Sequence, residues 1–253
     1  MKSIVFITGG TSGIGRACAE KFAAEGYRII ITGRRKDRLE NIKKELAEKF
    51  HTDILTLHFD VQNKKEVFDT ISALPEDWRQ ISVLINNAGL SLGRDNFVDA
   101  SLDDMEIMLH TNVDGLLYIS KALMPILLAN KTHIINIGSI AGKEVYENGN
   151  IYCVSKFAVD AITKSMRIDL LQHGLKVTAI HPGAVETEFS LVRYKGDRSK
   201  ADMVYQGFTP LSGADVANVI YYAASLPPHV CLNDIVVMPT QQASTSHFNK
   251  INQ

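Results

Sequence analysis

The sequence predicts an α/β fold in a single domain, with a doubly wound parallel sheet of about seven strands and helices on both faces. Short runs rich in β-branched residues alternate with longer helical patterns along the whole chain. The runs are almost continuously apolar, as expected for strands covered on both faces. A glycine-rich turn directly follows the first run, and no linker, repeat or low-complexity tract divides the 253 residues. This length is sufficient for one large α/β domain with a well-buried core.

The individual elements follow from these patterns. The expected strands are residues 3–8, 27–32, 54–60, 82–87, 133–139, 176–182 and 234–239. The expected helices are residues 14–25, 36–49, 64–73, 102–129, 152–172 and 213–225. Strand–helix–strand alternation over the whole length predicts right-handed crossovers between parallel strands. Pro125 lies inside the long fourth helix, where a kink or an early stop is expected.

Segments 184–212 and 240–253 depart from this alternation. Residues 184–212 are polar and charged, with only a short helical pattern near 199–206. A long excursion of this kind predicts a lid or substrate-binding loop. The C-terminal tail, 240–253, is polar and is expected to be disordered unless something holds it in place.

Composition excludes several classes of protein. Hydrophobic residues make up 45% and charged residues 22%, which is ordinary for a globular protein. The net charge of −1 creates no global field that would attract nucleic acid or an anionic membrane. The start "MKSIVFITGG" does not resemble a signal peptide, and no apolar run suggests a membrane span. We therefore expect a cytoplasmic protein with no nucleic-acid or membrane partner.

Cysteine and histidine spacing gives no sign of cross-links or metal sites. Cys18, Cys153 and Cys231 are far apart and odd in number, which favours a reducing compartment over a disulfide framework. The eight histidines form no HExxH or Cys/His ligand pattern, so no metal is expected. Spacing assigns no role to Cys153.

The stretch "TGGTSGIG" places Gly9, Gly13 and Gly15 in G-x-x-x-G-x-G spacing directly after the first strand. Glycine is needed where the backbone takes a positive φ or lets a ligand approach closely. A strand, a glycine turn and a helix start together expose backbone N–H groups that suit a pyrophosphate. On the first strand of a doubly wound sheet, this turn predicts a Rossmann dinucleotide-binding site rather than an ordinary glycine turn.

This glycine spacing resembles that of the short-chain dehydrogenase/reductase family. Further motifs carry the same resemblance in the family's order: "NNAG" (86–89), "HTNVDG" (110–115), "INIGSIAG" (135–142), "YCVSK" (152–156) and "PGAVETE" (182–188). The resemblance implies one dinucleotide-binding and catalytic domain over residues 1–253. It also implies the cofactor-binding residues, which are Gly9, Thr11, Ser12, Gly13, Ile14, Gly15, Arg34, Arg35, Asp60, Val61, Asn87, Tyr152, Lys156, Pro182, Gly183, Val185 and Thr187.

The end of the second strand, "TGRRKDRLE", indicates which nicotinamide cofactor is bound. An NAD site normally offers an acidic side chain here for the adenosine ribose. This chain instead offers Arg34 and Arg35, whose guanidinium groups suit a 2′-phosphate. NADP is therefore the expected cofactor. Lys36 and Arg38 are interpreted as solvated residues at a helix start.

Tyr152 and Lys156 are four residues apart in an expected helix, so their side chains lie one turn apart. Alone, such a pair is more often an ordinary surface pair with buried stems. A phenol with a pKa near 10 is a poor base at neutral pH. A lysine ammonium about 4 Å away, at an effective dielectric constant near 20, would favour the phenolate by roughly 4 kcal/mol, or about three pKa units. The pair is therefore suited to proton transfer with a substrate oxygen.

The resemblance implies a catalytic set of Asn112, Ser139, Tyr152 and Lys156. Ser139 follows the fifth strand, at the edge where open α/β sheets bind ligands, and its hydroxyl would orient the substrate oxygen. By the same resemblance, Lys156 would bind the nicotinamide ribose and Asn112 would hold a water on the proton relay. A buried hydrogen bond that kinks the helix is a structural interpretation of Asn112, and the two roles can coexist.

Segment 184–212 carries Arg193, Lys195 and Arg198, and a cationic lid suits a substrate with a carboxylate. A solvated basic loop is the alternative. The chain is also similar to NADP-dependent 3-hydroxy acid dehydrogenases, in "TGRRKDRLE", "NNAGLSLG", "HIINIGSIAG", "FSLVRYKGD" and "LPPHVCLNDIVVMP". That similarity implies oxidation of serine, allo-threonine or 3-hydroxypropionate, or reduction of malonic semialdehyde, with Ser139, Tyr152 and Arg193 binding the substrate.

Alternatives to this activity are a 3-oxoacyl-carrier-protein reductase, another carbonyl reductase, and a non-catalytic NADP(H) sensor. The intact Ser139–Tyr152–Lys156 set argues against the sensor, which would need only the glycine turn and the arginines. The resemblance further implies that the apolar stretches "LLYISKALMPILLA" and "VSKFAVDAITKSM" form a dimer interface within a homotetramer. A neighbouring subunit would then order the polar C-terminal tail.

Overall fold

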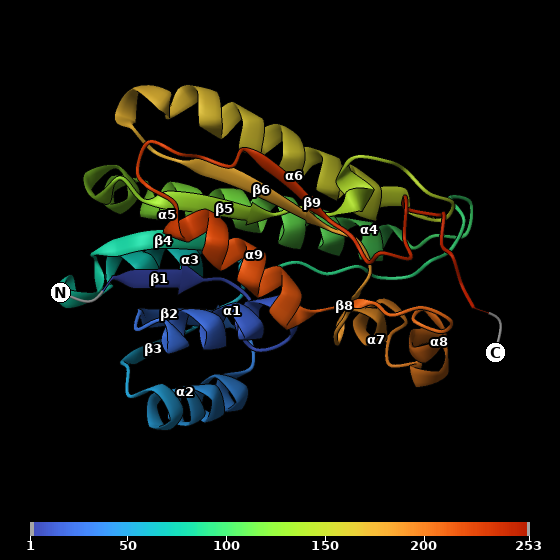
Figure 1. The fold of residues 1–253 in the computed structure, drawn as a ribbon, viewed down its shortest axis with the longest axis horizontal. Helices are drawn as coiled ribbons and strands as arrows, with labels where there is room; N and C mark the ends of the chain where they lie inside the picture. The colour runs from blue at the N-terminus through green and yellow to red at the C-terminus, as the bar shows by residue number, and fades with distance from the viewer. Residues whose placement is uncertain (1–2, 252–253) are drawn as a thin grey trace.

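The computed structural model describes residues 3–251 and contains, within that range, a seven-stranded sheet in the order β3-β2-β1-β4-β5-β6-β9 (Figure 1). The strands are β1 (Ile4–Ile7), β2 (Arg28–Gly33), β3 (Ile54–His58), β4 (Ile81–Asn86), β5 (His133–Ile137), β6 (Val177–Pro182) and β9 (Asp234–Val237). Each neighbouring pair is parallel, so the predicted doubly wound sheet is confirmed. The strand order reverses between β1 and β4, which is where open sheets of this type bind ligands.

Helices cover both faces of the sheet (Figure 1). One face carries α1 (Gly13–Ala24), α2 (Lys36–Phe50) and α9 (Gly213–Ser225), and the other carries α3 (Lys64–Ser72), α5 (Gly115–Asn130) and α6 (Asn150–Asp169). Short 3-10 turns occur at η1 (Glu76–Trp78), η3 (Ile140–Gly142) and η4 (Leu171–His173). The helix boundaries agree with the sequence patterns to within a few residues.

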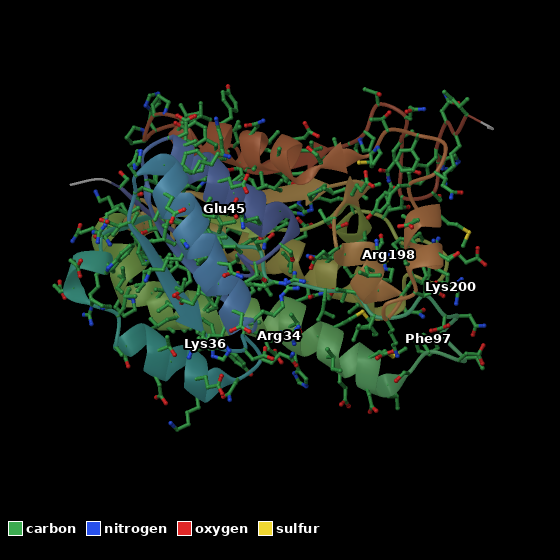
Figure 2. The ribbon with its side chains drawn as sticks, turned by 90° about the horizontal axis from the view of Figure 1, so that it is seen from below. Arg34, Lys36, Glu45, Phe97, Arg198 and Lys200 are labelled. Carbon is green, nitrogen blue, oxygen red and sulfur yellow. The ribbon has the colours of Figure 1, made fainter. Side chains whose placement is uncertain are left out.

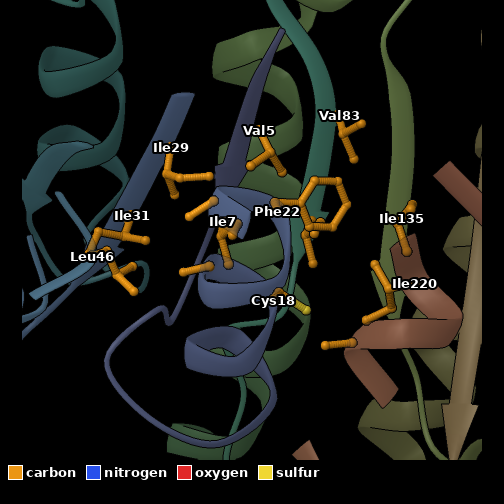
Figure 3. Packing of buried hydrophobic residues seen from close by; sticks show 14 of the residues in the cluster. Val5, Ile7, Cys18, Phe22, Ile29, Ile31, Leu46, Val83, Ile135 and Ile220 are labelled. Atoms are coloured by element: carbon orange, nitrogen blue, oxygen red, sulfur yellow. The ribbon is translucent and has the colours of Figure 1, made fainter. Parts of the chain in front are cut away.

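Both faces of the sheet are apolar because successive side chains of a buried strand point to opposite sides. Val5 and Ile7 of β1 belong to the cluster that contacts α1, α2 and α9, where Figure 3 shows them beside Cys18 and Phe22. Phe6 points the other way, into the cluster beneath α3, α5 and α6. Cys18 is fully buried in the cluster that contacts α1, α2 and α9, and the burial raises the pKa of its thiol. All three cysteines lie in the described part of the chain and are free, as the sequence predicts.

The long fourth helix is interrupted near its middle rather than at Pro125. α4 (Leu102–Leu109) passes through a π-helical turn, η2 (His110–Asp114), into α5. α5 continues through Pro125 to Asn130, so the expected early stop is wrong. Pro125 and Lys121 are both exposed, and the Lys121 carbonyl that loses its helical partner there can bind water.

The combined segment Leu102–Asn130 is long and apolar enough, by length and composition alone, to cross a membrane. This differs from the expectation that no apolar run suggests a membrane span. Core helices of globular domains pass the same test. Here α5 packs on α3 and β4, and α4 packs on α6, and these contacts bury 39% of the most apolar stretch of the segment.

Residues 184–212, which we call the lid, contain more regular structure than their sequence indicates. Their elements are β7 (Val185–Glu186), α7 (Phe189–Arg193), α8 (Arg198–Met203) and β8 (Leu211–Ser212), with β7 paired to β8. The helical pattern near 199–206 corresponds to α8, whereas α7 was not expected. Figure 1 shows α7 and α8 beside the carboxyl ends of the strands.

The C-terminal tail is held by its own chain over the described residues 240–251. The side-chain oxygen of Gln242 accepts a hydrogen bond of 2.8 Å from the backbone N–H of Ala184 in the lid. The Phe248 ring packs on Phe208 with 5.0 Å between centroids. These described residues therefore have partners within their own chain, the contribution of a neighbouring subunit stays a prediction, and 252–253 lie outside the described range.

Candidate active site

A cleft of about 340 Å³ opens where the segments that follow β1 to β6 meet the lid. Every predicted site residue lines this cleft except Gly15, Asn112 and Arg193. Those that line it are Gly9, Thr11, Ser12, Gly13, Ile14, Arg34, Arg35, Asp60, Val61, Asn87, Ser139, Tyr152, Lys156, Pro182, Gly183, Val185 and Thr187. The fold thus brings together residues from the full length of the motif series.

The glycine turn has the backbone geometry that its spacing predicts. Gly9 and Gly13 have φ angles of +67° and +54°, which L side chains rarely adopt. A Cβ on Gly15 would lie 2.4 Å from both the Gly9 oxygen and the Asn87 side-chain nitrogen. Gly15 therefore allows close packing behind the turn instead of lining the cleft. The Asn87 amide donates to the carbonyls of Thr8 and Gly9 at 2.9 and 3.1 Å and holds the turn in place.

The turn fits a dinucleotide on these observations. α1 begins at Gly13, which lines the cleft, so the unpaired N–H groups and positive dipole end of the helix meet the cleft. A side chain at Gly9 or Gly13 would occupy this space or strain the backbone. Such a cradle suits a pyrophosphate.

The predicted phosphate corner holds arginines that are already paired with carboxylates. Arg34, labelled in Figure 2, lines the cleft and lies 3.4 Å from Asp60. Arg35 lies 3.0 Å from Glu188 of the lid, and Arg38 contacts both oxygens of the same carboxylate at 2.8 and 2.9 Å. The interpretation of Arg38 as a merely solvated residue is therefore wrong. Sequence reasoning could not find the contact, since Glu188 is 150 positions away.

Tyr152 and Lys156 are buried, with exposed fractions of 8% and 7%, so the surface-pair interpretation is wrong. The Lys156 ammonium donates to the Ile137 carbonyl at 2.9 Å and lies 5.9 Å from the centroid of the Tyr152 ring. Burial lowers the pKa of Lys156 to about 8. Burial also raises the pKa of Tyr152 to about 12, and a nearby Arg193 charge and a hydrogen bond with Ser139 oppose this. The expected three-unit decrease from Lys156 is thus absent, because desolvation of the phenol dominates.

Asn112 lies in the π-helical turn and does not reach the cleft. Its side-chain oxygen accepts from the Leu90 N–H, and its nitrogen donates to the Leu90 carbonyl, both at 2.8 Å. The nitrogen also donates to the Ser155 hydroxyl at 3.0 Å. The side chain therefore joins the segment after β4 to α6, which matches the structural interpretation of this residue.

Arg193 is held against Tyr152 by aromatic and hydroxyl groups. Its guanidinium donates to the Tyr146 hydroxyl at 2.9 Å and to the Ser91 hydroxyl at 3.0 Å. The guanidinium carbon lies 4.9 Å from the centroid of the Tyr152 ring and 5.1 Å from that of Phe189. The charge is thus beside the candidate proton donor, although Arg193 does not line the main cleft.

The other lid cations are elsewhere. Lys195 pairs with Asp104 at 2.7 Å, on the outside of the lid. Arg198 and Lys200 lie on α8, well apart from Arg34 in Figure 2. Among the predicted cations Arg193, Lys195 and Arg198, only Arg193 lies beside Tyr152. The prediction of a cationic lid over the active site therefore applies to this arginine alone.

Sequence reasoning missed several residues of the site. Further residues that line the cleft are Thr32, Gly33, Phe59, Ala88, Gly89, Leu90, Thr111, Ile137, Gly138, Glu188, Phe189 and Val192. Most of them end a strand or directly follow one. Their position at the carboxyl edge of the sheet could therefore have been predicted from the expected strands. Tyr146 and Ser91, which hold Arg193, had no such signal.

Asp160, His181 and Asp234 form a cluster that no linear motif indicated. Their potential ligand atoms lie within 4.8 Å of one another. The Lys143 ammonium donates to both carboxylates at 2.9 Å and so takes the position where a cation would bind. The His181 Nδ1 faces the Ser139 carbonyl at 3.2 Å, which links this charged network to the candidate site.

A doubly wound parallel sheet with a glycine turn and a cleft at its switch point is the architecture of a dinucleotide-binding protein. A sequence model of the short chain dehydrogenases matches residues 3–196. The chain belongs to this family.

Relatives and a solved structure agree with this assignment. The chain is 43% identical, over 96% of each chain, to a protein of Chromohalobacter salexigens named sulfoacetaldehyde reductase 2. It is 42% identical to the NADP-dependent 3-hydroxy acid dehydrogenase YdfG of Salmonella typhi, over 95% of this chain and 96% of that one. A serine dehydrogenase structure in its closed form, complexed with NADP+, superposes with a TM-score of 0.92 at 38% identity, over 99% of this chain and 100% of the other.

Proposed function

We propose that this protein is an NADP-dependent oxidoreductase that transfers a hydride between the nicotinamide and the 3-hydroxyl of a small 3-hydroxy acid. Serine, allo-threonine and 3-hydroxypropionate are the proposed alcohols, and malonic semialdehyde is the proposed aldehyde. The observation that carries the proposal is the Arg193 guanidinium 4.9 Å from the Tyr152 ring, an anion-binding charge beside the proton donor. The relative named as an NADP-dependent 3-hydroxy acid dehydrogenase supports the same substrate class.

The proposed chemistry assigns one task to each side chain. The bound nicotinamide supplies or accepts the hydride. The Tyr152 hydroxyl gives a proton to the substrate oxygen during reduction and takes it back during oxidation. Ser139, whose hydroxyl opposes the increase that burial causes in the pKa of Tyr152, orients that oxygen. Lys156, with its pKa lowered to about 8, is poised to exchange a proton near neutral pH.

The proposed substrate-binding residues are Ser139 and Tyr152 at the reacting oxygen and Arg193 at the anion. Asn112 acts in this proposal by holding the Leu90 segment against α6. A guanidinium binds planar carboxylates and sulfonates through paired donors.

A sulfonate substrate is a second candidate, favoured by the relative named sulfoacetaldehyde reductase. Sulfoacetaldehyde and malonic semialdehyde both carry an aldehyde one methylene group away from an anion. The Arg193 site can accept either anion, and the assay must separate them.

One assay with purified protein tests these proposals. NADP reduction is measured with L-serine, allo-threonine and 3-hydroxypropionate, and NADPH oxidation with sulfoacetaldehyde, malonic semialdehyde and an acetoacetyl thioester. Turnover of the hydroxy acids supports the proposal, and turnover of sulfoacetaldehyde alone supports the sulfonate. Turnover of the thioester alone would favour a carrier-protein reductase. No turnover of any would favour the sensor.

Replacing Arg34 and Arg35 together by Ala is expected to raise the Michaelis constant for NADP far more than that for NAD, because only NADP carries the phosphate. The matched control is Lys36→Ala, which removes an exposed cation at the start of α2. Steady-state kinetics with both cofactors measure the effect. Equal increases for the two cofactors would remove the phosphate assignment.

We also propose a cytoplasmic homotetramer. The α6 face exposes Val154, Phe157 and Ile168, at 51%, 41% and 74% of their surfaces. Only 39% of the most apolar 18-residue stretch of Leu102–Asn130 is buried within the chain. These surfaces would be covered by a further copy of the chain, and sedimentation as a monomer at micromolar concentration would contradict this.

A further inference from the structure

Glu188 joins the lid to the start of α2 across the mouth of the cleft. It precedes α7, and its carboxylate contacts Arg35 at 3.0 Å and Arg38 at 2.8 Å. The Arg35 guanidinium also donates to the hydroxyls of Thr11 and Ser12 in the glycine turn, at 2.7 and 3.0 Å. Arg35 therefore spans from the turn to the lid, over the space that a dinucleotide would enter.

The charges at this corner nearly cancel. Arg34, Arg35 and Arg38 face the carboxylates of Asp60 and Glu188. The guanidinium groups of Arg35 and Arg38 hold the pKa of Glu188 below its usual range although burial opposes this, so the carboxylate is charged at neutral pH. An incoming phosphate thus meets arginines that already have an anionic partner.

We propose that Glu188 competes with the 2′-phosphate of NADP for Arg35 and Arg38, and so sets how tightly the chain holds NADP relative to NAD. The phosphate can displace the carboxylate because it carries more charge and more acceptor oxygens. The 2′-hydroxyl of NAD is neutral, so with NAD the arginines stay paired with Glu188. The phosphate can reach the arginines and replace the carboxylate, because the side chains of Arg35, Arg38 and Glu188 are 42%, 48% and 42% exposed.

The inference rests on the proposed assignment of Arg35 to the phosphate, and it is tested by binding without substrate, independently of the substrate assignment. The variants are Glu188→Gln and the matched control Glu186→Gln, which removes an exposed acid two residues earlier, in β7. The probes are NADPH and NADH, followed by the fluorescence of the bound dinucleotide, and 2′,5′-ADP and 5′-AMP, followed by calorimetry. Thermal unfolding without ligand verifies that each variant is folded.

Glu188→Gln is expected to lower the dissociation constants of NADPH and 2′,5′-ADP roughly threefold to tenfold. Those of NADH and 5′-AMP should change less than about twofold, since no displacement occurs with them. Glu186→Gln should change none of them. Weaker NADPH binding in Glu188→Gln, or equal changes for NADPH and NADH, would overturn the proposal. The role of Glu188 would then be to hold the lid against the start of α2.

A second arm separates competition from simple repulsion between Glu188 and the phosphate. In a chain with Arg35→Ala and Arg38→Ala, Glu188 has lost both partners for which it competes. Adding Glu188→Gln to that chain should leave the NADPH dissociation constant unchanged. A gain in affinity that persists there would show direct repulsion and overturn the proposal. If Arg35→Ala with Arg38→Ala weakens NADPH and NADH equally, the phosphate is not bound at this corner and the inference fails with it.

Discussion

Tyr152→Phe is expected to lower kcat by roughly 10²- to 10⁴-fold in both directions, because it removes the hydroxyl that is the proposed proton donor. The ring itself is retained, and it packs on Phe189 with 5.5 Å between centroids. Binding of NADPH should therefore change little. Steady-state kinetics with the substrate that the assay identifies, together with NADPH titration, measure both quantities.

The control for this substitution is Tyr146→Phe, which removes another hydroxyl from the same buried cluster. That hydroxyl accepts from Arg193, so its loss should raise KM and leave kcat nearly unchanged. A Tyr152→Phe enzyme that keeps kcat within about tenfold of the wild type would exclude Tyr152 as the proton donor.

The pH dependence should follow from the same phenol. Burial raises the pKa of Tyr152 to about 12, so the proton-accepting phenolate becomes more populated as the pH rises toward that value. Alcohol oxidation by the wild type is therefore expected to accelerate between about pH 7 and 10. Reduction uses the protonated phenol and should not share this increase.

Arg193→Met is expected to raise KM for an anionic substrate roughly 10- to 100-fold, since a charge-assisted contact is lost while the apolar stem is kept. The matched control is Lys195→Met, which removes the neighbouring lid cation that pairs with Asp104. It should leave KM almost unchanged.

An uncharged aldehyde of similar length, such as propanal, distinguishes anion binding from damage to the lid. Arg193→Met should affect its KM far less than that of the anionic aldehyde. Arg193 also opposes the increase in the pKa of Tyr152, so its loss should slow alcohol oxidation at a given pH. Equal losses for the charged and uncharged aldehydes would mean that Arg193 supports the lid and does not bind the anion.

Much of the fold was predictable because its signals are local. The φ angles of Gly9 and Gly13 are a property of the turn itself, and the spacing of Tyr152 and Lys156 follows from the helical repeat. Strand runs covered on both faces are apolar throughout, which identifies the parallel sheet without any tertiary information.

The errors arose where neighbours decide the outcome. The early stop expected at Pro125 is absent, and the long helix is interrupted instead at the π-helical turn around Asn112, whose side chain bonds Leu90 and Ser155 of other elements. The pKa of Tyr152 rises because the residues packed around the phenol remove it from water. The spacing of Tyr152 and Lys156 predicted only the effect of one lysine. The C-terminal tail is ordered by the lid of its own chain, which its polar composition did not indicate.

The amino-acid order alone was enough to establish the doubly wound sheet, the glycine turn and the Tyr152–Lys156 pair, since these depend on backbone conformation and short repeats. Only the folded chain brings Glu188 to Arg35, 153 positions apart, and Arg193 to Tyr146, 47 positions apart. Those contacts determine the net charge where the phosphate is proposed to bind, and they hold Arg193 where the substrate anion is proposed to bind. Electrostatic interactions depend on distance in space and on burial, and neither can be read from separation along a chain.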